Sequence, residues 1–150
     1  MPLIRIWAVE HAIASGVAAP TDILTAANHL AATTSHGRAS ASFRWRVESI
    51  GGRPVRAASG QVIPVDGAID GSSPADAIWL TSPFVADFER LLDRPAALAP
   101  LSNALRRQHA RGTLIATYCT GAFLLAEASF FSTVALPRRT GRRRRASARY

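Results

Sequence analysis

The sequence contains no lysine, a single cysteine and a single methionine, and it has no long uninterrupted apolar run. With Cys119 alone, the chain can form neither an internal disulfide framework nor a multi-cysteine metal site. Arg, Asp or Pro interrupts every apolar run before it reaches the ~20 residues of a membrane-spanning helix. The first residues also lack the basic stretch, apolar core and cleavage site of a signal peptide. We therefore expect a cytoplasmic protein that does not span a membrane.

The composition is that of one globular domain with a basic tail. The 150 residues are 48% hydrophobic and 19% charged, which suits one domain core and is too little chain for two. All eighteen basic residues are arginine, and residues 1–137 carry eleven of them against ten acids. The other seven lie within the last thirteen residues: Arg138, Arg139, Arg142, Arg143, Arg144, Arg145 and Arg149. The net charge of +8 therefore belongs to the tail and not to the domain.

Apolar patterns of strand and helix type alternate along the chain. We expect strands at 3–9, 43–50, 76–80 and 113–118, and a small hairpin over 55–65. The strand at 43–50 alternates apolar and charged residues, which is typical of one wet face near a sheet edge. Helices are expected from Pro20 onward, over 95–111 and over 122–128, the last one apolar nearly all round and hence buried. The alternation predicts an α/β fold whose largely parallel sheet is covered on both faces.

Cys119 stands where a buried strand turns directly into a helix. The segment Cys119-Thr120-Gly121 therefore has the mechanics of a nucleophile elbow, in which one side chain projects above the carboxyl edge of the sheet. Amides at the helix N-terminus can there stabilise a thiolate or receive an oxyanion, and the glycine lets the turn close without a Cβ clash. The alternative is an ordinary buried cysteine without reactivity.

Three segments resemble the PfpI-type, class I glutamine amidotransferase-like domain of AraC-family transcriptional regulators. They are the elbow segment 116–128, the helix end 106–112 and the loop and helix start 15–28, and the resemblance runs in consistent order over residues 3–131. It implies a flavodoxin-like three-layer sandwich with a mostly parallel sheet, incomplete at the C-terminus, and a ligand-sensing role. It also implies a homo-oligomer. Since these residues include no helix-turn-helix, we expect no sequence-specific DNA binding by this chain.

The resemblance also indicates which catalytic groups are missing. Enzymes of that superfamily carry Glu or Asp at the position of Gly16, and the glycine usual at their oxyanion site is replaced by Ser82-Pro83-Phe84. Glu10 is a nearby substitute, with a solvated loop acid as the alternative reading. A thiol without a base and an acid is a weak nucleophile, so Cys119 is a candidate nucleophile without partners.

We therefore expect binding of a small-molecule ligand without turnover, and neither a cofactor nor a metal. The site should lie at the carboxyl ends of the strands, where amides at Gly121 and Ala122 would suit a carbonyl or carboxylate. The expected lining residues are Glu10, Gly16, Ser82, Pro83, Cys119, Thr120 and Gly121. Two alternatives remain open: a small cysteine-dependent hydrolase, amidase or glyoxalase-like enzyme, and a nucleic-acid binder that uses the basic tail.

The periodic pattern stops after Phe131, and residues 132–150 are expected to form an Arg-rich, disordered tail. Codons for 132–141 can be chosen so that a shifted frame spells Asp-Gly-Arg-Ala-Thr-Thr-Pro-His-Trp, close to the continuation seen in PfpI-type domains. We hypothesise that the reading frame shifts near Ser132. The histidine of those domains would then be lost, with Arg139 near its place. The alternatives are a basic arm that binds phosphate backbones and a solvated tail without function.

Overall fold

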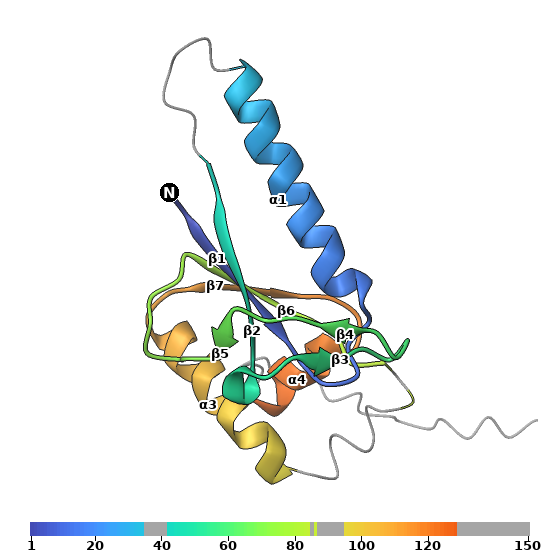
Figure 1. Cartoon of the computed structure of the whole chain (residues 1–150). Coiled ribbons are helices and arrows are strands. Elements are labelled where there is room, and N and C mark those ends of the chain that lie inside the picture. Colours follow the sequence, from blue (N-terminus) through green and yellow to red (C-terminus); the bar gives the residue numbers. More distant parts are fainter. Residues whose placement is uncertain (35–41, 85, 87–94, 129–150) are drawn as a thin grey trace, which may run out of the picture.

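The computed structural model describes residues 1–34, 42–84, 86 and 95–128, which form an α/β fold around a parallel sheet. The sheet strands are β1 (Leu3–Ala8), β2 (Arg44–Ser49), β5 (Gly67–Ala68), β6 (Ala77–Leu80) and β7 (Leu114–Thr117). Their order is β5-β2-β1-β6-β7, and every neighbouring pair is parallel. The helices are α1 (Ser15–Thr34), α3 (Pro95–Ala110) and α4 (Gly121–Glu127). Helix α1 covers one face of the sheet, and α3 and α4 cover the other (Figure 1).

The central strand β1 divides the core into two layers. Trp7 faces α3 and α4 and is fully buried among the leucines of α3. Ile6 and Ala8 face α1 and the hairpin, and they are equally inaccessible. A strand covered on both faces needs apolar residues at consecutive positions, which is why residues 3–9 read as a continuous apolar run and not as an alternation. The predicted first strand and the parallel sheet are confirmed.

Helix α1 begins five residues earlier than the sequence predicts. We expected Pro20 to open the helix, but the helix starts at Ser15 and contains Pro20. Proline has no N–H to donate to the carbonyl four residues before it, which here belongs to Gly16. The indole N–H of Trp79, on β6, donates to that carbonyl at 2.9 Å. A side chain distant in sequence thus supplies the hydrogen bond that Pro20 cannot make.

Short antiparallel strands form the predicted hairpin beside the sheet. They are β3 (Val55–Arg56) and β4 (Val62–Ile63), and a single 3-10 turn, η1 (Ile50–Gly52), leads into them from β2. Val55, Ala57 and Ile63 are buried and join the layer between the sheet and α1. The hairpin therefore packs as part of the core and not as a surface appendage.

Helices α3 and α4 occupy the opposite face of the sheet. Leu98, Leu101 and Leu105 form the buried stripe of α3, as their spacing predicts. The prediction that the helix over 122–128 is buried all round is wrong, because Phe123 is 57% exposed. Leu124, Leu125 and Ala128 pack against the core, whereas Ala122, Phe123 and Ala126 are exposed.

No described helix is long and apolar enough to cross a membrane. The predicted tail at 132–150 lies outside the described residues.

Candidate functional site

Cys119 sits at a sharp turn between a strand and a helix, as predicted. Strand β7 ends at Thr117 and helix α4 starts at Gly121, so only three residues make the turn. Cys119 has a φ of 50°, in the left-handed region that residues with a side chain rarely adopt, and its side chain is exposed. The elbow geometry is confirmed, and the sulfur lies at the carboxyl end of the parallel sheet.

Four of the predicted site residues meet beneath this turn. The hydroxyl of Thr120 donates to the carbonyl oxygen of Pro83 at 2.5 Å. The hydroxyl of Ser82 donates to the carbonyl oxygen of Tyr118 and accepts from the amide of Gly121 at 3.2 Å. A Cβ atom at Gly121 would lie 2.0 Å from the Thr117 hydroxyl, so a larger residue there would force Thr117 to move. Polar side chains thus tie the end of β6 to the elbow.

The backbone amides at the start of α4 already have protein acceptors. Gly121 N–H donates to the carbonyl oxygen of Tyr118 at 3.0 Å, in addition to its contact with Ser82. Ala122 N–H donates to the carbonyl oxygen of Cys119 at 3.2 Å. A carbonyl or carboxylate ligand on these two amides would have to replace bonds that the protein makes to itself.

Tyr118 packs against Gly16, one of the predicted site residues. A Cβ atom at Gly16 would lie 2.0 Å from the Tyr118 hydroxyl oxygen. The tyrosine ring stacks on Trp79 with 5.6 Å between ring centres and 19° between planes. Its hydroxyl is buried and has no hydrogen-bond partner among the described residues. Burial raises the pKa of Tyr118, so the phenol beside Gly16 is neutral.

Glu10 lies on the side of the hairpin. Its carboxylate accepts a hydrogen bond from the backbone N–H of Arg56 at 3.2 Å, and its side chain is exposed. The next residue, His11, has a φ of 58° and donates its own N–H to the carbonyl oxygen of Arg56 at 2.9 Å. The carboxylate of Glu10 is thus engaged in holding the loop to β3, and a role in ligand binding stays a prediction.

Comparison with solved structures identifies the fold. The structure is similar to a transcriptional regulator protein from Vibrio parahaemolyticus, with 17% identity and a TM-score of 0.66 over 87% of this chain and 63% of that one. It is also similar to DJ-1beta of Drosophila melanogaster, with 18% identity and a TM-score of 0.64 over 85% of this chain and 60% of that one. The chain has the DJ-1/PfpI fold.

An AraC family transcriptional regulator from Pseudomonas putida shares this DJ-1/PfpI fold, with 18% identity and a TM-score of 0.57 over 86% of this chain and 71% of that one. The chain spans about three fifths of the length of the first two structures. No protein-family model and no curated protein matches the sequence. The flavodoxin-like fold that the resemblance implied is therefore confirmed, on structural similarity.

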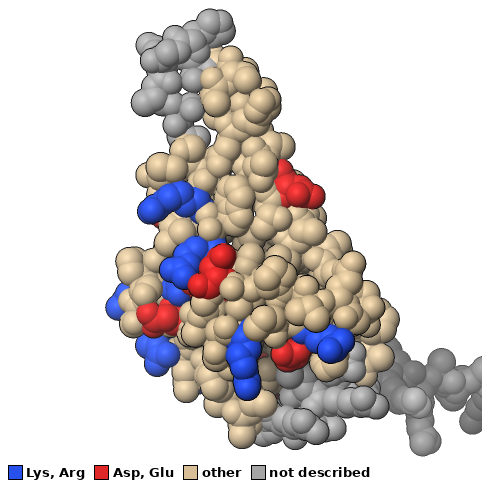
Figure 2. All heavy atoms as spheres, viewed as in Figure 1, with Lys and Arg blue, Asp and Glu red and all other residues tan. Residues whose placement is uncertain are grey.

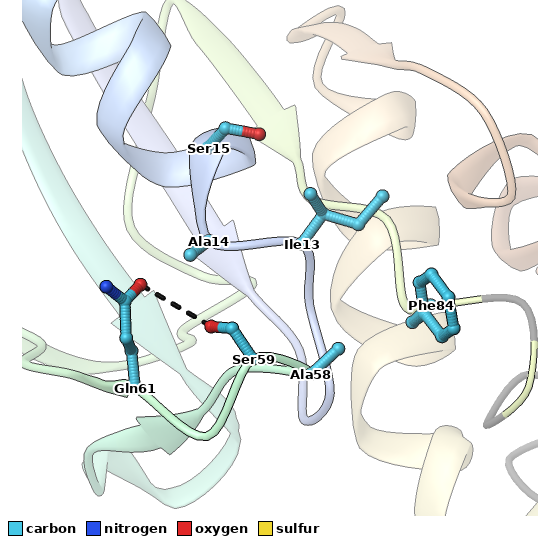
Figure 3. Close-up of a pocket in the computed structure, with 7 residues that line it drawn as sticks. All are labelled: Ile13, Ala14, Ser15, Ala58, Ser59, Gln61 and Phe84. Carbon is cyan, nitrogen blue, oxygen red and sulfur yellow. Dashed lines mark hydrogen bonds between the residues drawn. The ribbon is translucent and has the colours of Figure 1, made fainter.

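The DJ-1/PfpI fold of this chain also holds an open cavity of about 590 Å³ (Figure 3). It lies between the loop before α1, the turn of the β3–β4 hairpin and the residue after Pro83. Its lining residues are Ile13, Ala14, Ser15, Ala58, Ser59, Gln61 and Phe84. None of the seven expected ligand-binding residues is among them. Sequence reasoning missed the hairpin turn because nothing in its local pattern indicates that it folds against the loop before α1.

A second, smaller crevice of about 310 Å³ runs along the start of α1. It is lined by Ser15, Gly16, Ala19, Pro20, Trp79 and Tyr118, so Gly16 borders this crevice and not the larger cavity. The described residues contain no cluster of three or more His, Cys, Asp or Glu side chains that could hold a metal ion. On the face of these residues shown in Figure 2, basic and acidic side chains are interspersed, and neither sign forms a continuous patch.

Proposed function

We propose that this chain is a ligand-sensing domain of the kind found in AraC-family regulators, and that it binds a small molecule without converting it. The DJ-1/PfpI fold suits this role and also suits an enzyme, since its structural neighbours include a transcriptional regulator and a protein described as protease I. The choice between the two therefore depends on the groups around Cys119.

The observation that carries the proposal is the contact between Tyr118 and Gly16. A catalytic cysteine needs a neighbouring base or acid to activate it and to protonate the leaving group. Position 16 has no side chain, and the Tyr118 hydroxyl leaves no room for one there. The amides of Gly121 and Ala122, the natural oxyanion donors of an elbow, are bonded to protein oxygens. These two features support binding without turnover.

The experiment compares reactivity with binding on the same full-length protein. Alkylation of Cys119 by iodoacetamide at neutral pH should proceed no faster than that of a free peptide cysteine, with Cys119→Ser as the unreactive control. Methylglyoxal and a peptide p-nitroanilide should be left unchanged. A small-molecule library should contain compounds that raise the melting temperature equally for wild type and Cys119→Ser. Alkylation tenfold faster than the peptide, together with turnover that Cys119→Ser abolishes, would refute the proposal.

The enzyme alternative rests on the left-handed φ and exposure of Cys119. This conformation presents the sulfur to solvent at the edge of the sheet, as a nucleophile requires. It would be favoured by the rapid alkylation described above.

We further propose that the chain forms a homo-oligomer, because the exposed surface of α1 carries Ile23 and Leu30, which are 66% and 62% accessible. Light scattering coupled to size exclusion measures the mass directly. A single species of monomer mass at micromolar concentration would contradict this part of the proposal.

A further inference from the structure

We propose that the ligand occupies the cavity between the loop before α1 and the β3–β4 hairpin, and that it is an uncharged, mainly apolar small molecule with one hydrogen-bonding group. This inference rests on the proposed sensing function, and it names the ligand class and the place where the ligand binds.

The lining of the cavity defines the ligand class. Ile13, Ala14, Ala58 and Phe84 present apolar atoms, and Figure 3 shows Phe84 on the opposite side of Ile13 from the hairpin residue Gln61. Hydrogen-bonding groups come from Ser15 and from the hairpin pair, in which the Ser59 hydroxyl lies 3.5 Å from the Gln61 side-chain oxygen.

Among the described residues that line the cavity, none carries a charge. An ionised ligand would lose hydration there without gaining a counter-charge, which is costly, whereas a neutral one would gain by burying its apolar surface. The volume of about 590 Å³ falls in the range of small-molecule sites.

The walls of the cavity are held by backbone hydrogen bonds, so its shape does not depend on a ligand. Ala58 N–H donates to the carbonyl oxygen of Ala12 at 3.0 Å, which joins the hairpin turn to the loop. Phe84 N–H donates to the carbonyl oxygen of His11 at 2.8 Å on the other side. Ile13 N–H donates to the carbonyl oxygen of Ser82 at 3.1 Å. Three segments far apart in sequence are thus fixed together, and a ligand would bind without the cost of ordering them.

The loop also stores backbone strain at this point. His11 has a left-handed φ of 58° between the bonds that join it to β3 and to Phe84. Left-handed conformations in residues with side chains persist only where the surroundings hold them, and they concentrate at binding sites and switch regions. His11 therefore lies where the two walls of the cavity meet. By contrast, the backbone amides of Gly121 and Ala122 at the elbow are hydrogen-bonded to protein oxygens.

The test uses two fluorescent probes that differ in charge. N-phenyl-1-naphthylamine is neutral and apolar with one N–H group, and 1-anilinonaphthalene-8-sulfonate has the same skeleton with a negative charge. We expect the neutral probe to bind the full-length protein with at least tenfold lower Kd. In Ala58→Trp, an indole at this exposed position should fill the cavity and raise the Kd for the neutral probe at least tenfold.

Ala110→Trp is the matched control, because Ala110 is exposed at the end of α3, far in sequence from the residues that line the cavity, and it should bind as wild type does. Phe84→Ala removes one wall instead of filling the space, and it should weaken binding about tenfold. Circular dichroism on each variant verifies that the fold is retained.

Equal affinity of Ala58→Trp and Ala110→Trp would overturn the inference, and so would tighter binding of the charged probe. If Cys119→Ser abolishes binding and Ala58→Trp does not, the ligand sits on the elbow; the inference then fails and the sensing function stands. If Cys119 shows turnover while Ala58→Trp still blocks the neutral probe, the sensing function fails and the cavity assignment is supported.

Discussion

At the scale of single residues, the packing of Tyr118 against Gly16 can be tested as a pair. Gly16→Ala places a methyl carbon 2.0 Å from the Tyr118 hydroxyl oxygen, and the resulting strain should lower the free energy of unfolding by about 1–3 kcal/mol. Tyr118→Phe alone should be neutral or slightly stabilising, because the hydroxyl is buried without a described partner. Urea denaturation of both single variants and the double variant should give a coupling energy of at least about 1 kcal/mol. Additive effects would show that the two positions are not in contact.

A second residue-scale prediction concerns the left-handed conformation of Cys119. Glycine adopts a φ of 50° freely, whereas alanine retains the steric cost of its Cβ atom, about 1–2 kcal/mol. Cys119→Gly should therefore be more stable than Cys119→Ala by about 1 kcal/mol, in contrast to a helical or extended position, where glycine is the less stable of the two. Thermal and urea denaturation measure the difference. Greater stability of the alanine variant would mean that residue 119 does not have this conformation.

At the scale of elements, a buried ion pair joins β1 to β2. Arg5 donates to both carboxylate oxygens of Glu48, at 2.7 and 2.9 Å, and the two side chains are only 4% and 3% exposed. Trp7 adds a third donor to the same carboxylate at 3.1 Å. The remaining guanidinium nitrogen donates to the carbonyl oxygens of Asp70 and Ser73, so the pair also fixes the loop before β6. Its charges are thus fully engaged, and losing either partner leaves the other buried.

Glu48→Ala should therefore lower the free energy of unfolding by about 3–5 kcal/mol. The double variant Arg5→Met/Glu48→Met removes both charges and should lose less than Glu48→Ala alone. Glu10→Ala is the control, because Glu10 is exposed and makes a single hydrogen bond within the described residues, to a backbone amide; it should cost no more than about 1 kcal/mol. The measurement is urea denaturation at neutral pH. A small loss in Glu48→Ala, equal to that in Glu10→Ala, would contradict the buried assignment.

The elements also show where local sequence patterns succeed and fail. Residues 3–9 and 76–80 predict their strands because burial on both faces demands consecutive apolar residues. The start of α1 is predicted too late because Pro20 is tolerated inside the helix. The compensating hydrogen bond to the Gly16 carbonyl comes from Trp79, sixty-three positions after Gly16. The alternating pattern predicts that Glu48 faces solvent, because its buried partner Arg5 lies far from it in the sequence. Local sequence patterns thus predict which segments form strands and helices. Contacts between distant residues determine where a helix starts and which polar residues are buried.

In the whole molecule, the elbow and the cavity of the candidate site differ in how far apart their residues lie in the sequence. The elbow at Cys119 could be predicted because strand, turn and helix are adjacent in sequence. The cavity could not, because Ile13, Ala58 and Phe84 come from three segments that meet only in the folded chain. The sequence shows that position 16 is glycine and carries no acid. The packing of Tyr118 against Gly16 is visible only in the structure. Function therefore follows from contacts between elements more than from the motif itself.

The last prediction concerns the charge of the whole chain. Residues 132–150 hold seven arginines and no acid, so their removal lowers the formal charge from +8 to +1. The full chain should be retained on immobilised heparin at low salt and elute as salt displaces its contacts, whereas a chain ending at residue 131 should pass through. Arginine contacts to phosphates do not depend on base sequence. DNA duplexes of random and genomic sequence and equal length should therefore bind the full chain with equal affinity. Retention of the shortened chain, or preference for one duplex sequence, would place nucleic-acid recognition within the folded domain, where acidic and basic side chains are interspersed on the face in view (Figure 2).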